Sequence, residues 1–493
     1  MSIIIKLMGE NTIDTFYSPT QSGPPSSDLI GITKFTKNEI DFSIPQANIS
    51  GILLGNFDTS LFSSPPSTFA DFTGLNNSNF IVSDFKFFRG SALERQETYS
   101  PALTYNQFSQ WINPNSNLVF QTLLNGDDTF ITSSNGNDNS SFGAYGYDGN
   151  DSFYENQKMI KYQDNFYGGN GTDSVIYSSK SNNFIFTYSN YIWDEQSQKA
   201  NLQGFIITDT TKATNTLQIY QVERVQFTDK SVDLTPYLPN AQQGVKINFY
   251  GTHSIDSYYN SSNSGAPPPD QIIISNFTST QIDATVAVSS SLSLAITIQG
   301  LFDTSIFKSS PHTFQDIISA ANSNPNSTFL ISNLYLSAPN DPIRNEAYSK
   351  ALSLSQFMTW VNPSSQNLYE TFLSGNDIFY TSGNGNDQSS INLHTYAGDD
   401  TLVENQKLIK YADVFYGGDG VDAAVFSSKS SNFTITTSNS IWNDITQKGN
   451  LNGFIISDNT KNVNTLQINQ VESIKFADLT LDTSMFTKTA ALS

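Results

Sequence analysis

The sequence predicts an all-β protein that carries a few short helices and is built as a tandem duplication. Aromatic residues make up 13% of the chain, and apolar residues alternate with polar ones in several stretches, as expected for strands with one buried face. The same pattern occurs twice, since Trp111 matches Trp360 and Trp193 matches Trp442, each pair 249 positions apart. Glycine-rich turns separate the short apolar segments of both copies.

Each half is expected to contain three parts in the same order. A β-rich module with small helices comes first (1–122 and 245–371), and a block of glycine-rich turns follows (123–177 and 372–426). An alternating segment then predicts a β cap (178–244 and 427–493), which would cover backbone groups and apolar faces at the open end of the block. Helices are expected at 68–73, 105–112, 313–321 and 355–361.

The excess of acidic residues argues against partners that carry negative charge. Acidic residues outnumber basic ones by 45 to 24 in the 493 residues, which gives a formal net charge of −21. Nucleic acid is therefore a poor partner, because its phosphates need positive charge. The carboxylates are better explained as a supply of metal ligands. No apolar run reaches the length of a membrane span, and residues 1–16 lack the pattern of a cleaved signal peptide.

Catalytic motifs are missing from the sequence. The chain has no cysteine, no His-Glu-x-x-His and no Gly-x-Ser-x-Gly, and each of its three histidines occurs in only one half. These observations argue against thiol chemistry, zinc proteolysis and serine hydrolysis, so we expect the protein not to be an enzyme. A carboxylate pair for glycoside hydrolysis stays open, because the sequence does not show which acids lie together in space.

Two six-residue turns carry the clearest chemical signal, namely Gly-Gly-Asn-Gly-Thr-Asp at 168–173 and Gly-Gly-Asp-Gly-Val-Asp at 417–422. Glycine at the first, second and fourth positions allows positive φ angles and a tight turn. The inward carbonyls and the Asp at the sixth position would then offer the hard oxygen ligands that suit Ca²⁺. Two places after the Asp, an apolar residue would begin a strand and point into the core.

Looser copies of the turn flank the two intact ones. Successive Asp residues from Asp128 to Asp173 lie 10, 13, 13 and 9 positions apart, and the second half repeats these spacings. Asp164 and Asp413 depart furthest, because Tyr162 and Tyr411 stand where the turn has glycine. We expect several calcium ions per half. The expected metal-binding residues are Asn125, Gly126, Asp128, Asn135, Gly136, Asp138, Asp148, Gly149, Asp151, Asp164, Gly168, Gly169, Gly171 and Asp173, followed by Gly375, Asp377, Asn384, Gly385, Asp387, Gly398, Asp400, Asp413, Gly417, Gly418, Gly420 and Asp422.

The Gly-Gly-x-Gly-x-Asp-x-apolar-x pattern resembles the hemolysin-type (RTX) calcium-binding repeats of bacterial proteins. The resemblance covers 123–177 and 372–426 and implies a short parallel β-roll in each half. The uneven spacings imply insertions, because a regular roll repeats about every nine residues. The resemblance also implies type I secretion guided by an uncleaved C-terminal segment within 427–493. The protein would then be extracellular or lie at the cell surface.

These observations predict a secreted, calcium-binding structural protein that folds on Ca²⁺ and self-assembles into a surface layer, fibre or extracellular matrix. Duplication without catalytic motifs favours this function. An alternative is an adhesin or carbohydrate-binding protein, whose aromatic-rich module would supply stacking platforms for sugars. A secreted glycan-active enzyme is less favoured. The expected partners are calcium, further copies of the chain, and a glycan or cell surface, with no nucleic acid and no membrane span.

Overall fold

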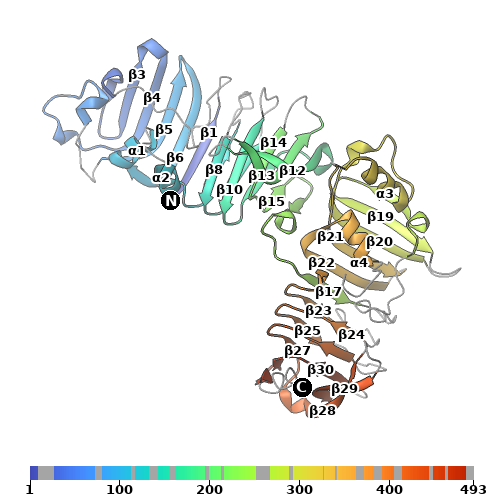
Figure 1. The fold of residues 1–493 in the computed structure, drawn as a ribbon. Coiled ribbons are helices and arrows are strands. Elements are labelled where there is room, and N and C mark those ends of the chain that lie inside the picture. The colour runs from blue at the N-terminus through green and yellow to red at the C-terminus, as the bar shows by residue number, and fades with distance from the viewer. Residues whose placement is uncertain are drawn as a thin grey trace. The chain divides into compact units, whose positions relative to one another are not determined.

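The computed structural model describes residues 1–8, 27–72, 80–112, 117–132, 143–155, 163–194, 199–211, 216–250, 267–287, 293–325, 327–338, 341–361, 371–381, 391–404, 413–443, 448–460 and 465–484. Its contacts divide the chain into two compact units, Met1–Pro239 and Asn240–Ser493. Each unit has an 11-stranded and a 5-stranded sheet, so the predicted all-β fold with a tandem duplication is confirmed (Figure 1). The boundary lies before Gln243 and Gly244, whose backbones pack against Gly375 of the second unit.

The first unit combines antiparallel strands at one end of its large sheet with parallel strands at the other. The order in the large sheet is β16 (Ser231–Asp233), β15 (Arg224–Gln226), β11 (Ser174–Tyr177), β9 (Ser152–Glu155), β7 (Thr129–Ile131), β1 (Ser2–Leu7), β6 (Ala92–Thr104), β5 (Ile81–Arg89), β4 (Ile49–Asn56), β3 (Glu39–Ile44) and β2 (Gly31–Phe35). The order in the small sheet is β12 (Phe184–Asp194), β13 (Lys199–Asp209), β14 (Thr216–Tyr220), β10 (Asp164–Asn170) and β8 (Gly143–Asp148).

The second unit repeats this arrangement. Its large sheet has the order β18 (Ile273–Phe277), β19 (Gln281–Ala287), β20 (Ser293–Phe302), β21 (Phe329–Ala338), β22 (Asp341–Ser353), β17 (Val245–Phe249), β23 (Ile378–Tyr380), β25 (Thr401–Glu404), β27 (Ala423–Phe426), β31 (Ser473–Lys475) and β32 (Thr480–Asp482). Its small sheet has the order β24 (Asn392–His394), β26 (Asp413–Tyr416), β30 (Thr465–Asn469), β29 (Lys448–Asp458) and β28 (Phe433–Asn443).

The helices are short. Helices α1 (Tyr105–Ile112), α3 (Phe314–Ser323) and α4 (Leu354–Val361) fall where the sequence predicts them, and a 3₁₀ turn, η4 (Phe69–Phe72), occupies the fourth position. The sequence reasoning missed α2 (Asn117–Leu123), which leads into the first glycine turn. Helix α3 begins with a reciprocal cap, in which Thr313 accepts the Asp316 N–H and the Asp316 side chain accepts the Thr313 N–H.

The parallel strands form a coil of two facing sheets. From β7 to β11 the chain alternates between the large and the small sheet, and each strand pairs in parallel with the strand two places away. The apolar residues two places after the turn Asp all point inward and are buried. They are Phe130, Phe153, Phe166 and Val175 in the first unit and Phe379, Leu402, Phe415 and Ala424 in the second. The Phe153 and Phe166 rings from opposite sheets stack at 5.0 Å.

Strand β1 joins the front module to the coil in one sheet. It pairs antiparallel with β6, its neighbour in Figure 1, where Ile4 faces Thr98. It pairs in parallel with the first coil strand β7, where Ile4 faces Thr129. Strand β17 has the same place in the second unit, between β22 and β23. The front module, the coil and the end of the cap therefore share one hydrogen-bonded sheet in each unit.

A buried charge network fastens α1 to β6. The carboxylate of Glu97, which is fully buried, lies 2.9 Å from Arg95 Nε and accepts a 2.7 Å hydrogen bond from Trp111 Nε1. Tyr99 donates to the same carboxylate. Arg344, Glu346, Tyr348 and Trp360 repeat the set in the second unit. The buried carboxylates of Glu97 and Glu346 thus each have an opposite charge and hydrogen bonds, without which their burial would be strongly unfavourable.

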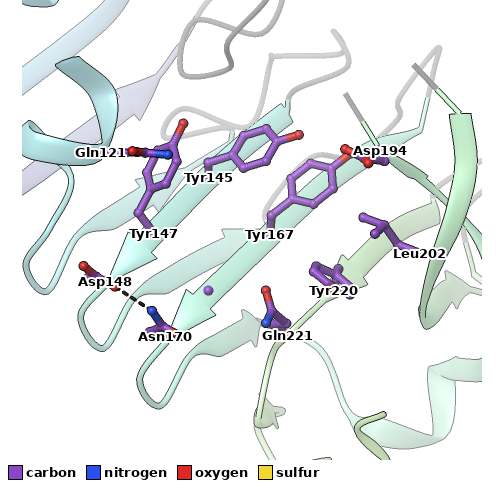
Figure 2. A pocket seen from close by; sticks show the side chains of 11 residues that line it. Gln121, Tyr145, Tyr147, Asp148, Tyr167, Asn170, Asp194, Leu202, Tyr220 and Gln221 are labelled. Carbon is purple, nitrogen blue, oxygen red and sulfur yellow. Dashed lines mark hydrogen bonds between the residues drawn. The ribbon is translucent and has the colours of Figure 1, made fainter. Parts of the chain in front are cut away.

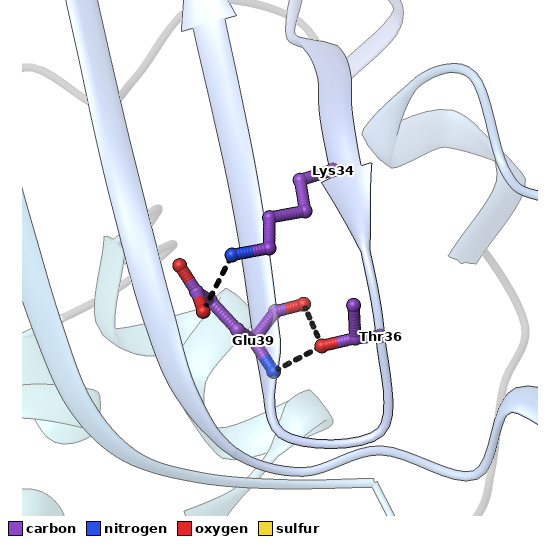
Figure 3. A network of polar contacts seen from close by, with 3 residues as sticks. All are labelled: Lys34, Thr36 and Glu39. Carbon is purple, nitrogen blue, oxygen red and sulfur yellow. Dashed lines mark hydrogen bonds and ion pairs between the residues drawn. The ribbon is translucent and has the colours of Figure 1, made fainter.

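The outer hairpin of the first module is closed by a polar turn (Figure 3). Thr36 Oγ1 donates to the Glu39 carbonyl and accepts the Glu39 N–H, both at 3.1 Å. Lys34 Nζ lies 2.7 Å from Glu39 Oε2 across the hairpin. In the second unit Thr278 and Gln281 make the same turn without the ion pair.

Candidate metal centre

The glycine turns of each coil gather in rows on two opposite edges, because successive turns connect the sheets in opposite directions. Asp128, Asp151 and Asp173 come from alternate turns and stack on one edge, where β7, β9 and β11 begin. The structural repeat is therefore 22 or 23 residues, one passage through both sheets, and this explains the uneven spacings in the sequence. The turn that contains Asp164 belongs to the opposite edge.

The stacked carboxylates form a continuous hydrogen-bond ladder in the first unit. Asp128 Oδ1 accepts the Ile3 N–H at 2.5 Å, and the Asp128 N–H donates to Asp151 Oδ1 at 2.7 Å. The Asp151 N–H donates to Asp173 Oδ1 at 2.8 Å, and the Asp173 N–H donates to Glu223 Oε2 at 2.7 Å. Each carboxylate thus holds the turn of the preceding strand in register.

The second unit repeats the ladder. Asp377 Oδ1 accepts the Val245 N–H at 2.6 Å. The N–H groups of Asp377, Asp400 and Asp422 donate in turn to Asp400 Oδ1 (2.7 Å), Asp422 Oδ1 (2.9 Å) and Glu472 Oε2 (2.9 Å). The predicted Asp residues at 128, 151 and 173, and those at 377, 400 and 422, are thus brought together.

Sequence reasoning missed Glu223 and Glu472, which complete the two ladders. The available signal was the Gln-Val-Glu segment that occurs in both caps. It also missed an outer row of acceptors at the fifth turn position. Asp127 Oδ1 accepts the Asn150 N–H at 2.8 Å, and Asp399 Oδ1 accepts the Val421 N–H at 2.9 Å. An Asn or Asp directly before the turn Asp was the signal for this row.

The remaining predicted residues have several environments. Asp164 and Asp413 are buried on the opposite edge, where Asp413 Oδ1 accepts the Ile391 N–H at 2.8 Å. Asn125 Oδ1 accepts a hydrogen bond from the Met1 amino group at 3.3 Å, and Asp148 Oδ1 accepts one from Asn170 Nδ2 at 2.8 Å. Neither lies in the ladder. The six predicted residues outside the described part of the chain are Asn135, Gly136, Asp138, Asn384, Gly385 and Asp387.

The glycines are required by conformation and by stacking. Gly169 and Gly171 have φ angles of +108° and +139°, and their counterparts Gly418 and Gly420 have +100° and +146°. A Cβ at Gly171 would lie 1.8 Å from the Gly149 carbonyl oxygen of the next turn. Neighbouring turns therefore pack backbone against backbone, and their carbonyl oxygens lie close to the ladder. A Cβ at the other predicted glycines, Gly126, Gly149, Gly168, Gly375, Gly398 and Gly417, would also lie within 3 Å of backbone or carboxylate atoms.

The buried carboxylates of the ladder would be stabilised by a nearby positive charge. Burial raises the pKa of Asp128 to about 9, that of Asp151 to about 8 and that of Asp173 to about 7. Backbone N–H donors lower these pKa values, and neighbouring carboxylates raise them further. In the second unit burial raises the pKa of Asp377 well above its ordinary range and that of Asp422 to about 7. Ionising all three carboxylates of a ladder is therefore costly without a cation.

The residues of the ladder fit a hard cation. Asp128, Asp151 and Asp173 each use Oδ1 for the ladder, whereas Oδ2 is buried and has no hydrogen-bond partner among the described residues. Asp173 Oδ2 and the Gln221 carbonyl oxygen both lie beside Gly168. A Cβ at Gly168 would be 2.4 Å from the carboxylate oxygen and 2.1 Å from the carbonyl oxygen. No group of three His, Asp or Glu side chains in the described ranges converges as a metal-binding cluster. Backbone carbonyls would therefore have to supply much of the ligand set, as they do at many calcium sites.

Comparisons with known proteins add little. No family model matches the chain, and no curated protein matches it. Among solved structures, the extracellular lipase LipA from Serratia marcescens aligns with a TM-score of 0.17 and 8% sequence identity. The alignment covers 70% of this chain and only 36% of the lipase chain. A TM-score this low carries no argument about fold or function. None of the helices among the described residues combines the length and the apolar character that a membrane span requires.

Proposed function

We propose that this chain is a secreted calcium-binding protein of the RTX type, whose two coils fold when Ca²⁺ binds along the aspartate ladders. The observation that carries the proposal is the row of buried carboxylates beside stacked glycine turns, each with one oxygen that has no hydrogen-bond partner within the described part of the chain. Bound calcium would supply the positive charge that these carboxylates lack. Asp128, Asp151 and Asp173 would hold ions in the first unit, and Asp377, Asp400 and Asp422 in the second.

Calcium binding would couple folding to location. The net charge of −21 and the stacked carboxylates oppose folding where calcium is scarce, so the chain would stay unfolded and fit for export. Outside the cell, sites with dissociation constants of roughly 10⁻⁴–10⁻³ M would fill. Each filled site adds RT ln(1+[L]/Kd), on the order of 1 kcal/mol, so several sites together decide whether the coils fold. Type I secretion agrees with this order of events.

We further propose that the folded protein is a structural component that self-assembles and is not an enzyme. The duplication supports this role, because two copies of one surface allow head-to-tail contacts between molecules. Negative-stain microscopy tests it directly. Sheets or filaments that form with Ca²⁺ and disperse with chelator are expected, whereas dispersed particles under both conditions contradict assembly.

Circular dichroism and calorimetry test the calcium proposal itself. In excess chelator at pH 8 we expect the β signal of the coils and their melting transitions to disappear, and added Ca²⁺ to restore them. Mg²⁺ at the same concentration is the matched control, since it prefers a smaller octahedral site with bound water. Identical spectra and melting temperatures with calcium and with chelator would refute the proposal.

A further inference from the structure

A polar, aromatic groove lies on the outer face of the small sheet of the first unit (Figure 2). Its volume is about 440 Å³, within the usual range for small-molecule sites. Strands β8, β10 and β14 form its floor. The groove is distinct from the ladder, because Asp151 Oδ2 and Asp173 Oδ2 approach Gly146 and Gly168, which alternate with the groove residues along β8 and β10.

Tyrosines occupy one register position on these three neighbouring strands. Tyr145 on β8 faces Tyr167 on β10, which faces Tyr220 on β14. The Tyr145 and Tyr167 rings stack at 4.1 Å with an interplanar angle of 9°. Tyr167 donates a 2.6 Å hydrogen bond to the Trp193 carbonyl, which holds its ring in place. Tyr145 and Tyr167 are only 8% and 4% exposed, whereas Tyr220 is partly exposed, so the aromatic wall is rigid and Tyr220 offers more accessible surface than either stacked ring.

A fourth tyrosine, Tyr147, lies next to Tyr145 and has a positive φ angle. Tyr147 lies 5.7 Å from Tyr145, ring to ring, and has a φ of +69° at the turn position where the next turn has Gly169. Tyr396 has a φ of +63° at the matching position of the second unit, so both coils hold a bulky residue with this uncommon backbone conformation at the same turn. Among the described residues its buried hydroxyl has no hydrogen-bond partner. Figure 2 shows Tyr147, Tyr145 and Tyr167 side by side.

The rest of the lining consists mainly of hydrogen-bonding groups. Asp148 and Asn170 bond to each other at the turn end of the groove, and Asp194 lies at the other end (Figure 2). Gln121 and Gln221 add two amides. None of the described lining residues is Lys, Arg or His. Such a lining suits a neutral ligand with many hydroxyls and an apolar ring face, and it disfavours phosphate, sulfate and carboxylate groups.

The second unit shows that the fold does not require this wall. The matching register positions hold His394, Tyr416 and Asn469, so two of the three tyrosines are replaced. Yet the strands pair as in the first unit, and His394 stacks on Tyr416 at 3.9 Å. Tyr396 and Tyr416 repeat Tyr147 and Tyr167, so only Tyr145 and Tyr220 are particular to the first unit and not required by the coil.

We propose that the groove of the first unit binds a neutral oligosaccharide, with a sugar ring against the tyrosine wall and its hydroxyls on Asp148, Asn170 and Asp194. Because Tyr147 and Gly169 belong to the glycine turns, a folded coil is needed to form the groove. This dependence on calcium, and only this part, rests on the proposed function.

Isothermal titration of the full chain in Ca²⁺ with cellotetraose, maltotetraose and chitotetraose tests the proposal. We expect one of these neutral probes to bind at one site per chain, and a heparin tetrasaccharide to bind more weakly. The double variant Tyr145→His, Tyr220→Asn carries the residues that the second unit tolerates at the same positions. It should keep the melting temperature and lose about tenfold or more in affinity, since two ring contacts are removed.

The reciprocal variant His394→Tyr, Asn469→Tyr, Ala397→Asp supplies both tyrosines and, at the position of Asp148, the carboxylate that the second unit lacks; it should raise the stoichiometry toward two per chain. Failure of all three neutral probes to bind at up to about 5 mM, tighter binding of the heparin fragment, or unchanged affinity in the Tyr145→His, Tyr220→Asn variant would each overturn the groove proposal. Binding that persists in chelator would leave the groove intact and remove its dependence on calcium. Loss of binding in chelator, with no effect of the tyrosine substitutions, would support the calcium dependence and refute the groove as the binding site.

Discussion

The two units agree closely along the aspartate ladder and differ on the outer face of the same turns. The ladder of each unit contains three aspartates and a terminal glutamate, with hydrogen bonds of 2.5–2.8 Å in the first unit and 2.6–2.9 Å in the second. On the outer face, Tyr145 corresponds to His394 and Tyr220 to Asn469. Positions that determine how backbones stack are thus repeated, whereas these two outward positions have diverged.

The largest expected effect comes from the stacked glycines, where both units should respond alike. Gly171→Ala would place a Cβ 1.8 Å from the Gly149 oxygen, and Gly420→Ala would place one 1.9 Å from the Gly398 oxygen. We expect each change to lower the free energy of unfolding of its unit by about 2–3 kcal/mol in Ca²⁺, through positive φ and overpacking. Calorimetry measures this.

Gly31→Ala is the matched control for these glycines. Its Cβ would lie no closer than 3.8 Å to the nearest atom, and the backbone does not have the positive φ that excludes side chains. Its effect should stay within about 0.5 kcal/mol. If only one of Gly171→Ala and Gly420→Ala lowers the free energy of unfolding, the two units are not equivalent, because the turns of the other unit are then not tightly stacked.

The next effect separates the two edges of each coil. Asp173→Ala and Asp422→Ala should weaken calcium binding roughly tenfold or more, because each removes a charged ligand from an intact glycine turn. Asp164→Ala and Asp413→Ala should weaken it less, because the turns of the opposite edge lack the full glycine pattern. Calorimetric titration measures the affinities. Equal losses at all four positions would show that both edges bind calcium equally well.

Without calcium, the stability of the folded protein should decrease as pH rises. Burial raises the pKa of Asp128, Asp151 and Asp173 to between about 7 and 9 in the folded state, against an ordinary value near 4. The folded state therefore binds protons more tightly than the unfolded chain, and stability in chelator should fall as pH rises from about 4 to 9. With Ca²⁺ present, stability should instead rise with pH, since metal binding displaces these protons.

Melting temperatures at several pH values, with and without chelator, test both directions. Structure that chelation removes at pH 8 should return at pH 5. A melting temperature in chelator that is constant over this range, or that rises with pH, would show that the ladder carboxylates are not protonated in the folded protein.

A smaller effect should distinguish the units at acid pH. Burial lowers the pKa of His394 to about 4, against an ordinary value near 6.5. The folded second unit thus favours the neutral imidazole, and its stability should be lost as pH falls from 6.5 through 4. The first unit has Tyr145 at this position and should not show the effect. His394→Tyr should abolish it, and melting of the wild-type and variant chains across this pH range is the measurement.

The smallest effect is expected at the outer hairpin. The Lys34–Glu39 ion pair is well exposed, and the matching hairpin of the second unit closes with Gln281 and no ion pair. Lys34→Ala should therefore leave the melting temperature unchanged, whereas Thr36→Val, which removes both bonds of the turn hydroxyl, should lower it measurably. A larger loss from Lys34→Ala than from Thr36→Val would reverse this assignment.

Much of the architecture could be predicted from local patterns. The repeat of Trp111 at Trp360, the glycines of the two intact turns and the inward apolar residue after each Asp together predicted a duplicated coil of parallel strands. These signals are local because they depend on positive φ and on alternation along a strand. The separation of the turns onto two edges was not predicted, since it depends on the length of each strand and loop.

The part of the site that sequence reasoning missed depends on contacts between distant residues. Glu223 reaches Asp173 across 50 positions, and Ile3 reaches Asp128 across 125. The tyrosine wall was also missed, because Tyr145, Tyr167 and Tyr220 meet only through strand register. The sugar platforms expected in the front modules stay a prediction, and aromatic residues such as Phe72 and Phe80 pack into the buried core there.

The central place of β1 has a consequence for the rate of folding. This strand lies between β6 and β7, so its partners are about 100 and 125 residues further along the chain, and β17 has the same relation to β22 and β23. Contacts of such high sequence separation slow the search for the native state, and we expect refolding on the scale of seconds or longer. During this delay β7 and β23 lack the neighbour that covers one side of each coil. Calcium would thus act on a chain in which the first coil strand of each unit is covered late, and a stopped-flow calcium jump should show binding to the coils and completion of the sheet as separate phases.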